Sequence, residues 1–199
     1  MKISIIGASG HGKVVADIAK KNGYDEIEFF DDDENLSVCG KWPVVGTIGQ
    51  AYDRENDVFI AIGNTKIRQK FMDCFQKRRF ATLIHPDAII ADDVVIGEGS
   101  VVMAGAVINS GTKIGRGVII NTCSSVDHDC ELGDFVHISV GAHLCGKVVV
   151  GEGTWIAVGA SVINNVDICP GCIIGAGAVV IKSIDESGTY VGVPARKIK

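Results

Sequence analysis

The chain has 199 residues, enough for one or two domains that each bury a hydrophobic core. Hydrophobic residues make up 47% of it and charged residues 22%, a composition typical of globular rather than disordered proteins. The formal net charge is −5 and no long run of clustered Lys and Arg is present. Nucleic acids and anionic membrane surfaces are therefore not expected as partners.

The N-terminal sequence MKISIIGASGHG lacks the hydrophobic stretch and cleavage site of a signal peptide. We therefore expect a cytoplasmic protein whose seven cysteines stay reduced. The motif CPGC at residues 169–172 resembles a redox motif, but it lacks the strand–helix–strand surroundings of such motifs. No membrane insertion is expected, because the uncharged segment 168–181 contains Pro170 and is shorter than the roughly 20 residues of a spanning helix.

The N-terminal part alternates strand and helix patterns. Residues 2–7 predict a buried strand, and the helix that follows is predicted to end at Gly23. A second strand is predicted at 26–33, a third at 57–64, and a second helix at 65–79. This order implies a small, Rossmann-like parallel sheet, and we assign it to a domain spanning 1–80.

Three loops fall at the carboxyl edge of this predicted sheet. Gly7, Gly10 and Gly12 lie between a strand and a helix, where backbone N–H groups favour a phosphate, although their spacing is not the dinucleotide fingerprint. Asp31 and Asp32 lie at the end of the second strand, where an acid can hold a ribose or a base, and the sequence AIGN ends the third. The loops together predict a crevice for a phosphorylated ligand; the alternative is that the glycines only turn the chain.

A six-residue repeat occupies the second half of the chain. Every sixth residue from Ile84 to Val180 is Ile, Val or Leu, and every sixth residue from Ala88 to Ala178 is small or β-branched. These two positions are two residues apart across the repeat boundary, so they share one face of a short strand, and intervening glycines such as Gly97 permit bends. The pattern predicts a parallel β-helix in which each coil is buried by its neighbours.

The repeat and the tail sequence YVGVPARKI resemble the hexapeptide-repeat acyltransferases. This resemblance implies a left-handed, triangular all-β helix over residues 81–199, a homotrimer, and acyl-coenzyme A bound in grooves between subunits. The stretches GASGHG, DD, AIGN and NTCSSVDHDCELGDFVHISVGA together resemble one subfamily, the nucleotide-sugar N-acetyltransferases of the bacillosamine-pathway type and the related sialic acid O-acetyltransferase-like proteins. We therefore expect acetyl-CoA as co-substrate and a UDP-linked 4-amino-4,6-dideoxy sugar as acceptor.

The resemblance also implies roles for individual residues. His128 corresponds to the catalytic base, and Asp129 beside it stands where the subfamily usually carries Glu. The diphosphate, sugar and uridine are expected to contact Ser9, Gly10, His11, Asp31, Asp32, Gly63, Asn64 and Asn121. The coenzyme is expected to contact His137, Gly146, Val158 and Ala176.

The repeat register predicts the direction of the remaining histidine side chains. His137 and His143 occupy the position between two inward-facing residues, so we expect them to point outward on adjacent faces of the helix. Two histidines so placed cannot bind one metal within a chain, and no metal is expected. Three alternatives remain open: an O-acetyltransferase of sialic acid or another sugar, a carbonic anhydrase-like zinc hydratase with an intersubunit site, and a nucleotide-binding scaffold without enzymatic activity.

Overall fold

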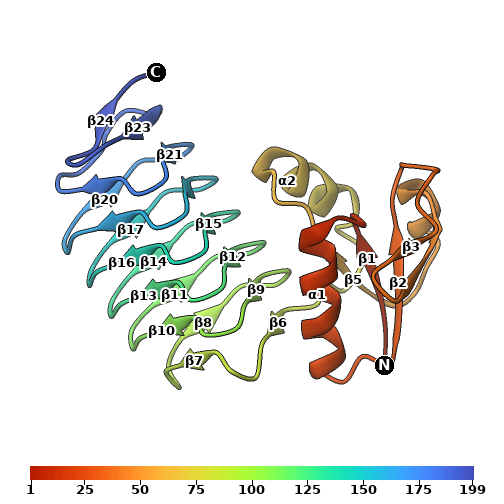
Figure 1. Cartoon of the computed structure of the whole chain (residues 1–199). Helices are drawn as coiled ribbons and strands as arrows, with labels where there is room; N and C mark the ends of the chain where they lie inside the picture. Colours follow the sequence, from red (N-terminus) through yellow and green to blue (C-terminus); the bar gives the residue numbers. More distant parts are fainter. The chain divides into compact units, whose positions relative to one another are not determined.

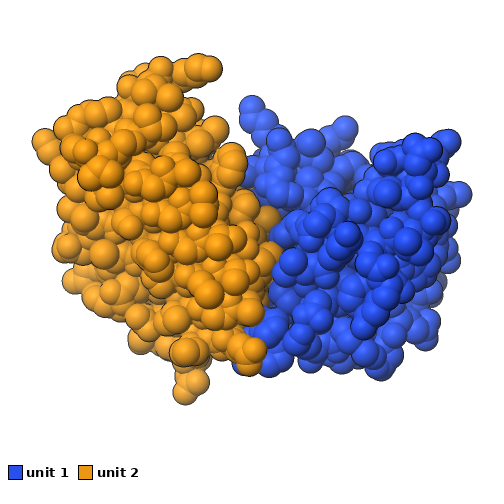
Figure 2. Space-filling view, in the orientation of Figure 1, with its two compact units in different colours: residues 1–86 blue, residues 87–199 orange.

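The computed structural model describes residues 1–199, which divide into two compact units, Met1–Pro86 and Asp87–Lys199 (Figure 2). The boundary expected from the sequence, after residue 80, lies slightly before this division. Each unit has its own sheet architecture and its own hydrophobic core, and the two are described separately.

The first unit is built on a five-stranded sheet in the order β3-β4-β2-β1-β5 (Figure 1). Strands β1, β2, β4 and β5 run parallel, and β3 pairs antiparallel with β4. Helix α1 packs on β1 and β2, α2 packs on β5, and the short 3-10 helix η1 packs on β1 and β2. The bounds are β1 Lys2–Ile6, α1 Gly10–Lys21, β2 Glu26–Phe30, β3 Val38–Cys39, β4 Trp42–Gly46, η1 Ile48–Ala51, β5 Asp57–Ile60, α2 Thr65–Cys74 and β6 Leu83–Ile84.

Helix α1 begins earlier than the sequence pattern predicts, within the glycine turn itself. A Cβ on Gly12 would lie 2.4 Å from the carbonyl oxygen of Gly7 and 3.0 Å from the ring of Phe29. The missing side chain therefore lets the first turn of the helix pack directly against the strands. Gly23, with φ +88°, follows the end of the helix as predicted.

The second unit is a left-handed parallel β-helix of short strands arranged on three faces (Figure 1). Its strands on the first face are β7 Ile89–Ile90, β10 Val107–Ile108, β13 Ser125–Val126, β16 His143–Leu144, β19 Ser161–Val162 and β22 Val179–Val180. The second face holds β8 Val95–Ile96, β11 Lys113–Ile114, β14 Glu131–Leu132, β17 Val149–Val150 and β20 Asp167–Ile168. The third face holds β9 Val101–Val102, β12 Ile119–Ile120, β15 His137–Ile138, β18 Trp155–Ile156, β21 Ile173–Ile174, β23 Thr189–Val191 and β24 Arg196–Lys197.

The coils of the β-helix stack in constant register. His137 pairs with Trp155, and His143 pairs with Ser161, each partner lying one coil further along the chain. The large residues of the repeat fill the interior: Ile120, Val126, Ile138 and Leu144 are at most 1% exposed. The predicted periodic core is therefore confirmed. His137 is half-buried and His143 exposed, each before a buried residue, so both point outward as predicted, and they lie on two adjacent faces.

The corners of the β-helix use left-handed backbone. Every sixth residue from Gly99 to Gly177 has a positive φ, and Cys123, Asp129, Phe135, Lys147 and Asn165 are the non-glycine members of this series. A separate column of glycines is needed for a different reason, close approach of successive coils. A Cβ on Gly97, Gly115, Gly133 or Gly151 would lie 2.4–2.7 Å from a backbone nitrogen of the next coil.

Candidate active site

The N-terminal end of α1 leaves backbone donors available. Ser9 is the N-cap residue, yet its side chain makes no capping hydrogen bond. Gly10 is exposed, and a Cβ placed on it would meet no atom within 4 Å. No acidic side chain lies in the first turn. An uncapped helix start with open space beside it can accept an anion such as a phosphate.

His11, in the same turn, is largely buried and stays neutral. Burial, helped by the positive charge of Arg68, lowers the pKa of His11 from 6.5 to about 4. Its Nε2 atom is buried without a hydrogen-bond partner. A neutral imidazole can donate or accept a hydrogen bond, but it cannot neutralise a diphosphate by charge.

The two acids after β2 bond to the protein's own backbone. The carboxylate of Asp31 accepts hydrogen bonds from Ala8 N, at 2.7 Å, and from Asp33 N, at 3.0 Å. The carboxylate of Asp32 accepts one from Ile48 N, at 3.0 Å, at the start of η1. Asp31 therefore ties the turn after β1 to the end of β2, a role that sequence reasoning did not assign to it.

The loop after β5 is held by a buried cation. Arg68, which is 1% exposed, donates from Nη1 to the carbonyl oxygens of Ile62 and Gly63, both at 2.9 Å. Asn64 caps α2, because its side chain accepts a hydrogen bond from Ile67 N. This role of Arg68 was not predicted, since an arginine inside a helix pattern gives no sign that its side chain folds back under the preceding loop.

The predicted catalytic pair lies at the corner between the first and second faces. His128 Nδ1 is 2.9 Å from Asp129 Oδ2, and both side chains are about half exposed. Asp129 has φ +58°, the left-handed conformation of this corner position, which short polar residues tolerate. The corner therefore places two sequence neighbours side by side, which a flat strand would not.

Asp127, the other acid beside His128, is engaged elsewhere. Its Oδ1 accepts hydrogen bonds from Asn109 Nδ2, at 2.8 Å in the preceding coil, and from His128 N, at 2.9 Å. These two donors hold the pKa of Asp127 below its usual value. Of the two acids flanking His128 in the sequence, it is Asp129 that contacts the imidazole.

A second polar cluster lies at the corner between the third and first faces. Asn121 Nδ2 is 3.3 Å from His137 Nε2, and its Oδ1 accepts a hydrogen bond from Thr122 N. The His137 ring stacks on that of Trp155, with 6.1 Å between centroids, and Trp155 Nε1 donates to Ser139 Oγ at 2.7 Å. A donor-rich aromatic surface of this kind can hold a polar ligand with flat groups.

An exposed apolar column runs beside this cluster. Val140 and Val158 are 45% and 53% exposed, Ala176 is also exposed, and Gly159 N and Gly177 N donate to the carbonyls of Val140 and Val158.

The site residues predicted in the β-helix fall at two different corners within one chain. His128, Asp129 and Gly146 lie at one corner, while the other holds Asn121, His137, Val158 and Ala176.

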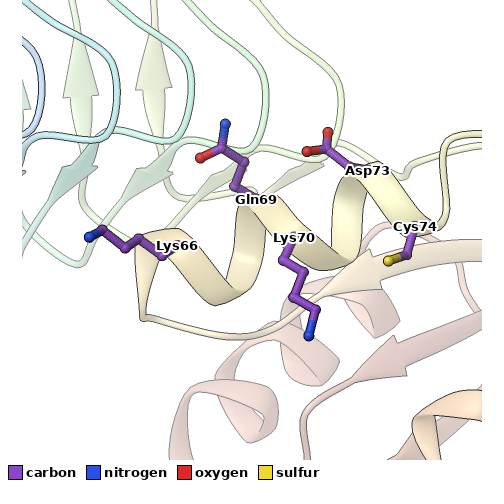
Figure 3. Close-up of a pocket in the computed structure, with 5 residues that line it drawn as sticks. All are labelled: Lys66, Gln69, Lys70, Asp73 and Cys74. Carbon is purple, nitrogen blue, oxygen red and sulfur yellow. The ribbon is translucent and has the colours of Figure 1, made fainter.

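Other features of the structure do not coincide with these clusters. A surface pocket along α2 is lined by Lys66, Gln69, Lys70, Asp73 and Cys74, none of which was predicted to bind a ligand (Figure 3). No group of three or more His, Cys, Asp or Glu residues is arranged to hold a metal ion. No helix has both the length and the apolar character that crossing a bilayer requires.

Two family models match the chain. Residues 2–75 match the PglD N-terminal domain, and residues 80–110 match the bacterial transferase hexapeptide repeat.

Curated relatives match part of the chain. The GDP-perosamine N-acetyltransferase of Escherichia coli O157:H7 is 37% identical over 93 residues, which are 46% of this chain and 42% of the relative. The UDP-N-acetylbacillosamine N-acetyltransferase of Bacillus subtilis (strain 168) is 38% identical over 110 residues, covering 51% of each chain. The chain thus spans about half the length of these curated relatives.

Solved structures match nearly the whole chain. The acetyltransferase domain of PglB from Neisseria gonorrhoeae FA1090, in complex with acetyl coenzyme A, is 40% identical with a TM-score of 0.96, covering 99% of this chain and 98% of that one. PerB from Caulobacter crescentus, in complex with CoA and GDP-perosamine, is 36% identical with a TM-score of 0.94, covering 100% and 98%.

Proposed function

Because this chain belongs to the family of nucleotide-sugar N-acetyltransferases that join a PglD N-terminal domain to a hexapeptide-repeat β-helix, we propose that it transfers the acetyl group of acetyl-CoA to the amine of a UDP-linked 4-amino-4,6-dideoxy sugar. The observation that carries the proposal is the contact between His128 and Asp129 at an exposed corner of the β-helix. A histidine oriented by a carboxylate is a suitable general base for this reaction.

The proposed chemistry begins with removal of a proton from the amine. A sugar ammonium first loses one proton to water, which leaves the neutral amine that can attack the thioester carbonyl, and the nitrogen loses a second proton to the base as the amide forms. Asp129 accepts a hydrogen bond from His128 Nδ1, so this nitrogen carries the proton and Nε2 is the proton acceptor. His128 is therefore the base, and Asp129 fixes its tautomer and orientation.

The acetyl group passes directly between the two substrates. The new C–N bond forms as the nitrogen attacks, the negative charge on the carbonyl oxygen is held by a backbone N–H group of a coil, and collapse breaks the C–S bond. The proton taken up by His128 then neutralises the departing coenzyme A thiolate. No acyl-enzyme intermediate is required.

The N-terminal unit holds the nucleotide in this proposal. The uncapped start of α1 at Ser9 and Gly10 binds the diphosphate, and neutral His11 contributes hydrogen bonding rather than charge. Asp31 keeps the turn in shape through Ala8 N while its remaining acceptor capacity is available to the uridine. UDP is favoured by the bacillosamine-type relative, and GDP is the competing nucleotide because perosamine-type relatives are equally similar.

We further propose that the enzyme is a homotrimer with the coenzyme bound between subunits. Within one chain, three of the four predicted coenzyme residues, His137, Val158 and Ala176, lie at a different corner from His128, whereas the fourth, Gly146, lies beside it. Packing the His128 corner of one copy, between the first and second faces, against the His137 corner of another, between the third and first faces, would bring the two sets together. Exposed Val149 and Trp155, at 40% and 43%, supply apolar area for such a contact.

The first experiment identifies the acceptor. Purified protein is incubated with acetyl-CoA and a panel of UDP-linked and GDP-linked amino sugars together with sialic acid, and free thiol release is followed. We expect turnover with a UDP-linked 4-amino sugar. Turnover with the GDP-linked sugars alone would replace UDP in the proposal, and turnover with sialic acid alone would favour an O-acetyltransferase.

The second experiment tests the base. We expect His128→Ala to lower kcat by about 10²–10⁴-fold, the usual contribution of a general base, with little change in the affinity for the nucleotide sugar. Asp129→Ala should lower kcat less, because it orients the base without transferring the proton. His143→Ala is the matched control, since its imidazole is outward-facing but contacts Ser125, at 2.8 Å. Full activity of His128→Ala at saturating substrates would exclude this histidine as the base.

A further inference from the structure

The space that a side chain on Gly146 would occupy is filled by the ring of His128. Gly146 follows His128 by one full coil, at the same corner. A Cβ placed on it would lie 2.5 Å from Nε2, 2.6 Å from Cε1 and 3.0 Å from Cδ2 of that imidazole. All three nearest atoms belong to His128, and no backbone atom of another coil is among them. The ring therefore rests on the bare backbone of Gly146.

Backbone conformation does not explain the glycine. Gly146 is absent from the residues with positive φ, unlike the neighbouring corner residue Lys147, whose φ is +58°. The stacking hydrogen bonds of this corner, Lys147 N to His128 O at 2.9 Å and Asn165 N to Gly146 O at 3.1 Å, use backbone atoms that any residue possesses. In the following coil the equivalent position holds Asn164, so a side chain is compatible with this corner.

We propose that Gly146 is a positioning residue for the catalytic imidazole. The ring is fixed from two sides, by the 2.9 Å contact of Nδ1 with Asp129 and by the backbone of Gly146 beneath Nε2, Cε1 and Cδ2. A carbon atom only 2.5 Å from Nε2 is closer than packed atoms allow, so a methyl group here displaces the ring. The displaced ring loses either its contact with Asp129 or its alignment with the reacting amine.

The catalytic consequence rests on the proposed function. A misplacement of about 1 Å at a reacting group can cost about 10²-fold in rate. We expect Gly146→Ala to lower kcat by about that factor while the KM for both substrates changes less than threefold, roughly 0.6 kcal/mol. Asn164→Ala, which carries the same methyl group at the equivalent position one coil later, should retain the parental kcat. An unchanged kcat in Gly146→Ala would overturn the proposal.

A thermal unfolding cycle tests the steric relation without any substrate. The melting temperatures of the parent, Gly146→Ala, His128→Ala and the double variant are compared. We expect Gly146→Ala to lower Tm in the parent and to have no such effect once His128 is alanine, because the methyl group then enters vacated space. Equal losses in both backgrounds would mean that the coil itself requires glycine.

The cycle also covers failure to fold and failure of the proposed function. A folded double variant beside a misfolded Gly146→Ala supports the steric relation, whereas two misfolded variants overturn it. If no acetyl transfer is found with any acceptor, the Tm cycle still decides whether Gly146 positions His128. A raised KM for acetyl-CoA that persists in the His128→Ala background would instead assign Gly146 to the coenzyme alone.

Discussion

The two units specify residue positions in different ways. In the β-helix, one register sets the environment of every side chain: Ser125, His143 and Ser161 follow one another on the same face because each is one coil after the last. In the α/β unit, each loop has its own set of contacts, such as the hydrogen bond from Ala8 N to Asp31. Neighbouring coils can therefore supply the shape of the proposed catalytic corner, whereas the proposed nucleotide site depends on contacts that occur once.

The difference predicts where substitutions are most costly. At Gly97, Gly115, Gly133 and Gly151 of the β-helix an added side chain meets the backbone of the next coil, which cannot move without shifting the stack. In the α/β unit a misfit more often meets open space or the end of a side chain. Three predictions sharpen this contrast, from the largest expected effect to the smallest.

Gly133→Ala should cause the largest loss of stability. Its Cβ would lie 2.7 Å from Glu152 N and 3.0 Å from Glu152 Cα, both backbone atoms of the next coil. We expect the free energy of unfolding to fall by about 3 kcal/mol or more, as for overpacking that backbone must absorb. Gly10→Ala, with no atom within 4 Å of the new Cβ, should change stability by less than about 1 kcal/mol. Chemical denaturation measures both, and equal losses would remove the contrast between the units.

His11 should make the stability of the protein fall in mild acid. Its pKa is lowered from 6.5 to about 4 by burial and by Arg68, so the folded state favours the neutral imidazole. The contribution of neutral His11 to the free energy of unfolding is fully present above pH 6.5. It is lost as pH falls toward 4, because the unfolded chain takes up the proton first. The loss should reach about 2 kcal/mol by pH 5.

The measurement compares the parent with His11→Gln, which does not titrate. The difference in unfolding free energy between the two proteins should be constant above pH 7. Between pH 6.5 and 5 the unfolding free energy of the parent should fall relative to that of His11→Gln. Parallel curves across this range would mean that His11 is more solvated than its buried Nε2 indicates.

Asp31→Ala should produce the smallest effect on stability and a separate effect on binding. Loss of the acceptor for Ala8 N and Asp33 N leaves two backbone donors without a partner, so we expect destabilisation of about 1–2 kcal/mol. UDP affinity should fall as well, because the turn that presents Ser9 and Gly10 loses its tie to β2. Titration calorimetry measures the change in UDP affinity. Unchanged stability together with unchanged affinity would contradict both the structural and the binding role of Asp31.

The sequence predicts the β-helix far better than it predicts the proposed nucleotide site, because only the β-helix has a repeating pattern. The repeat reveals the interior and the outward faces, because period alone determines which side chains point inward. The choice between Asp127 and Asp129 could not be read from it, since it depends on Asn109 one coil earlier and on a left-handed φ at Asp129. Which glycine makes room for the imidazole likewise emerges only when coils are stacked.

In the α/β unit the sequence missed elements that have no periodic signal. Strands β3 and β4 lie in a segment containing Gly40 and Pro43, and their alternation is too short to recognise. Helix α1 begins at Gly10 although glycine is a poor helix former, because close packing of Gly12 on Gly7 outweighs that propensity. The burial of His11 depends on this packing and was not predicted.

The stacking register also constrains how this protein can change length. Because each strand pairs with the strand one coil later, as His137 does with Trp155, an insertion of a single residue within a coil would turn every later side chain onto a different side of the prism. Insertion of a whole coil would preserve the phase and translate the C-terminal part by about one strand spacing, 4.8 Å. Descendants of this sequence are therefore expected to differ by complete coils or by loops extruded at corners, with the coil carrying His128 keeping Gly146 directly above it.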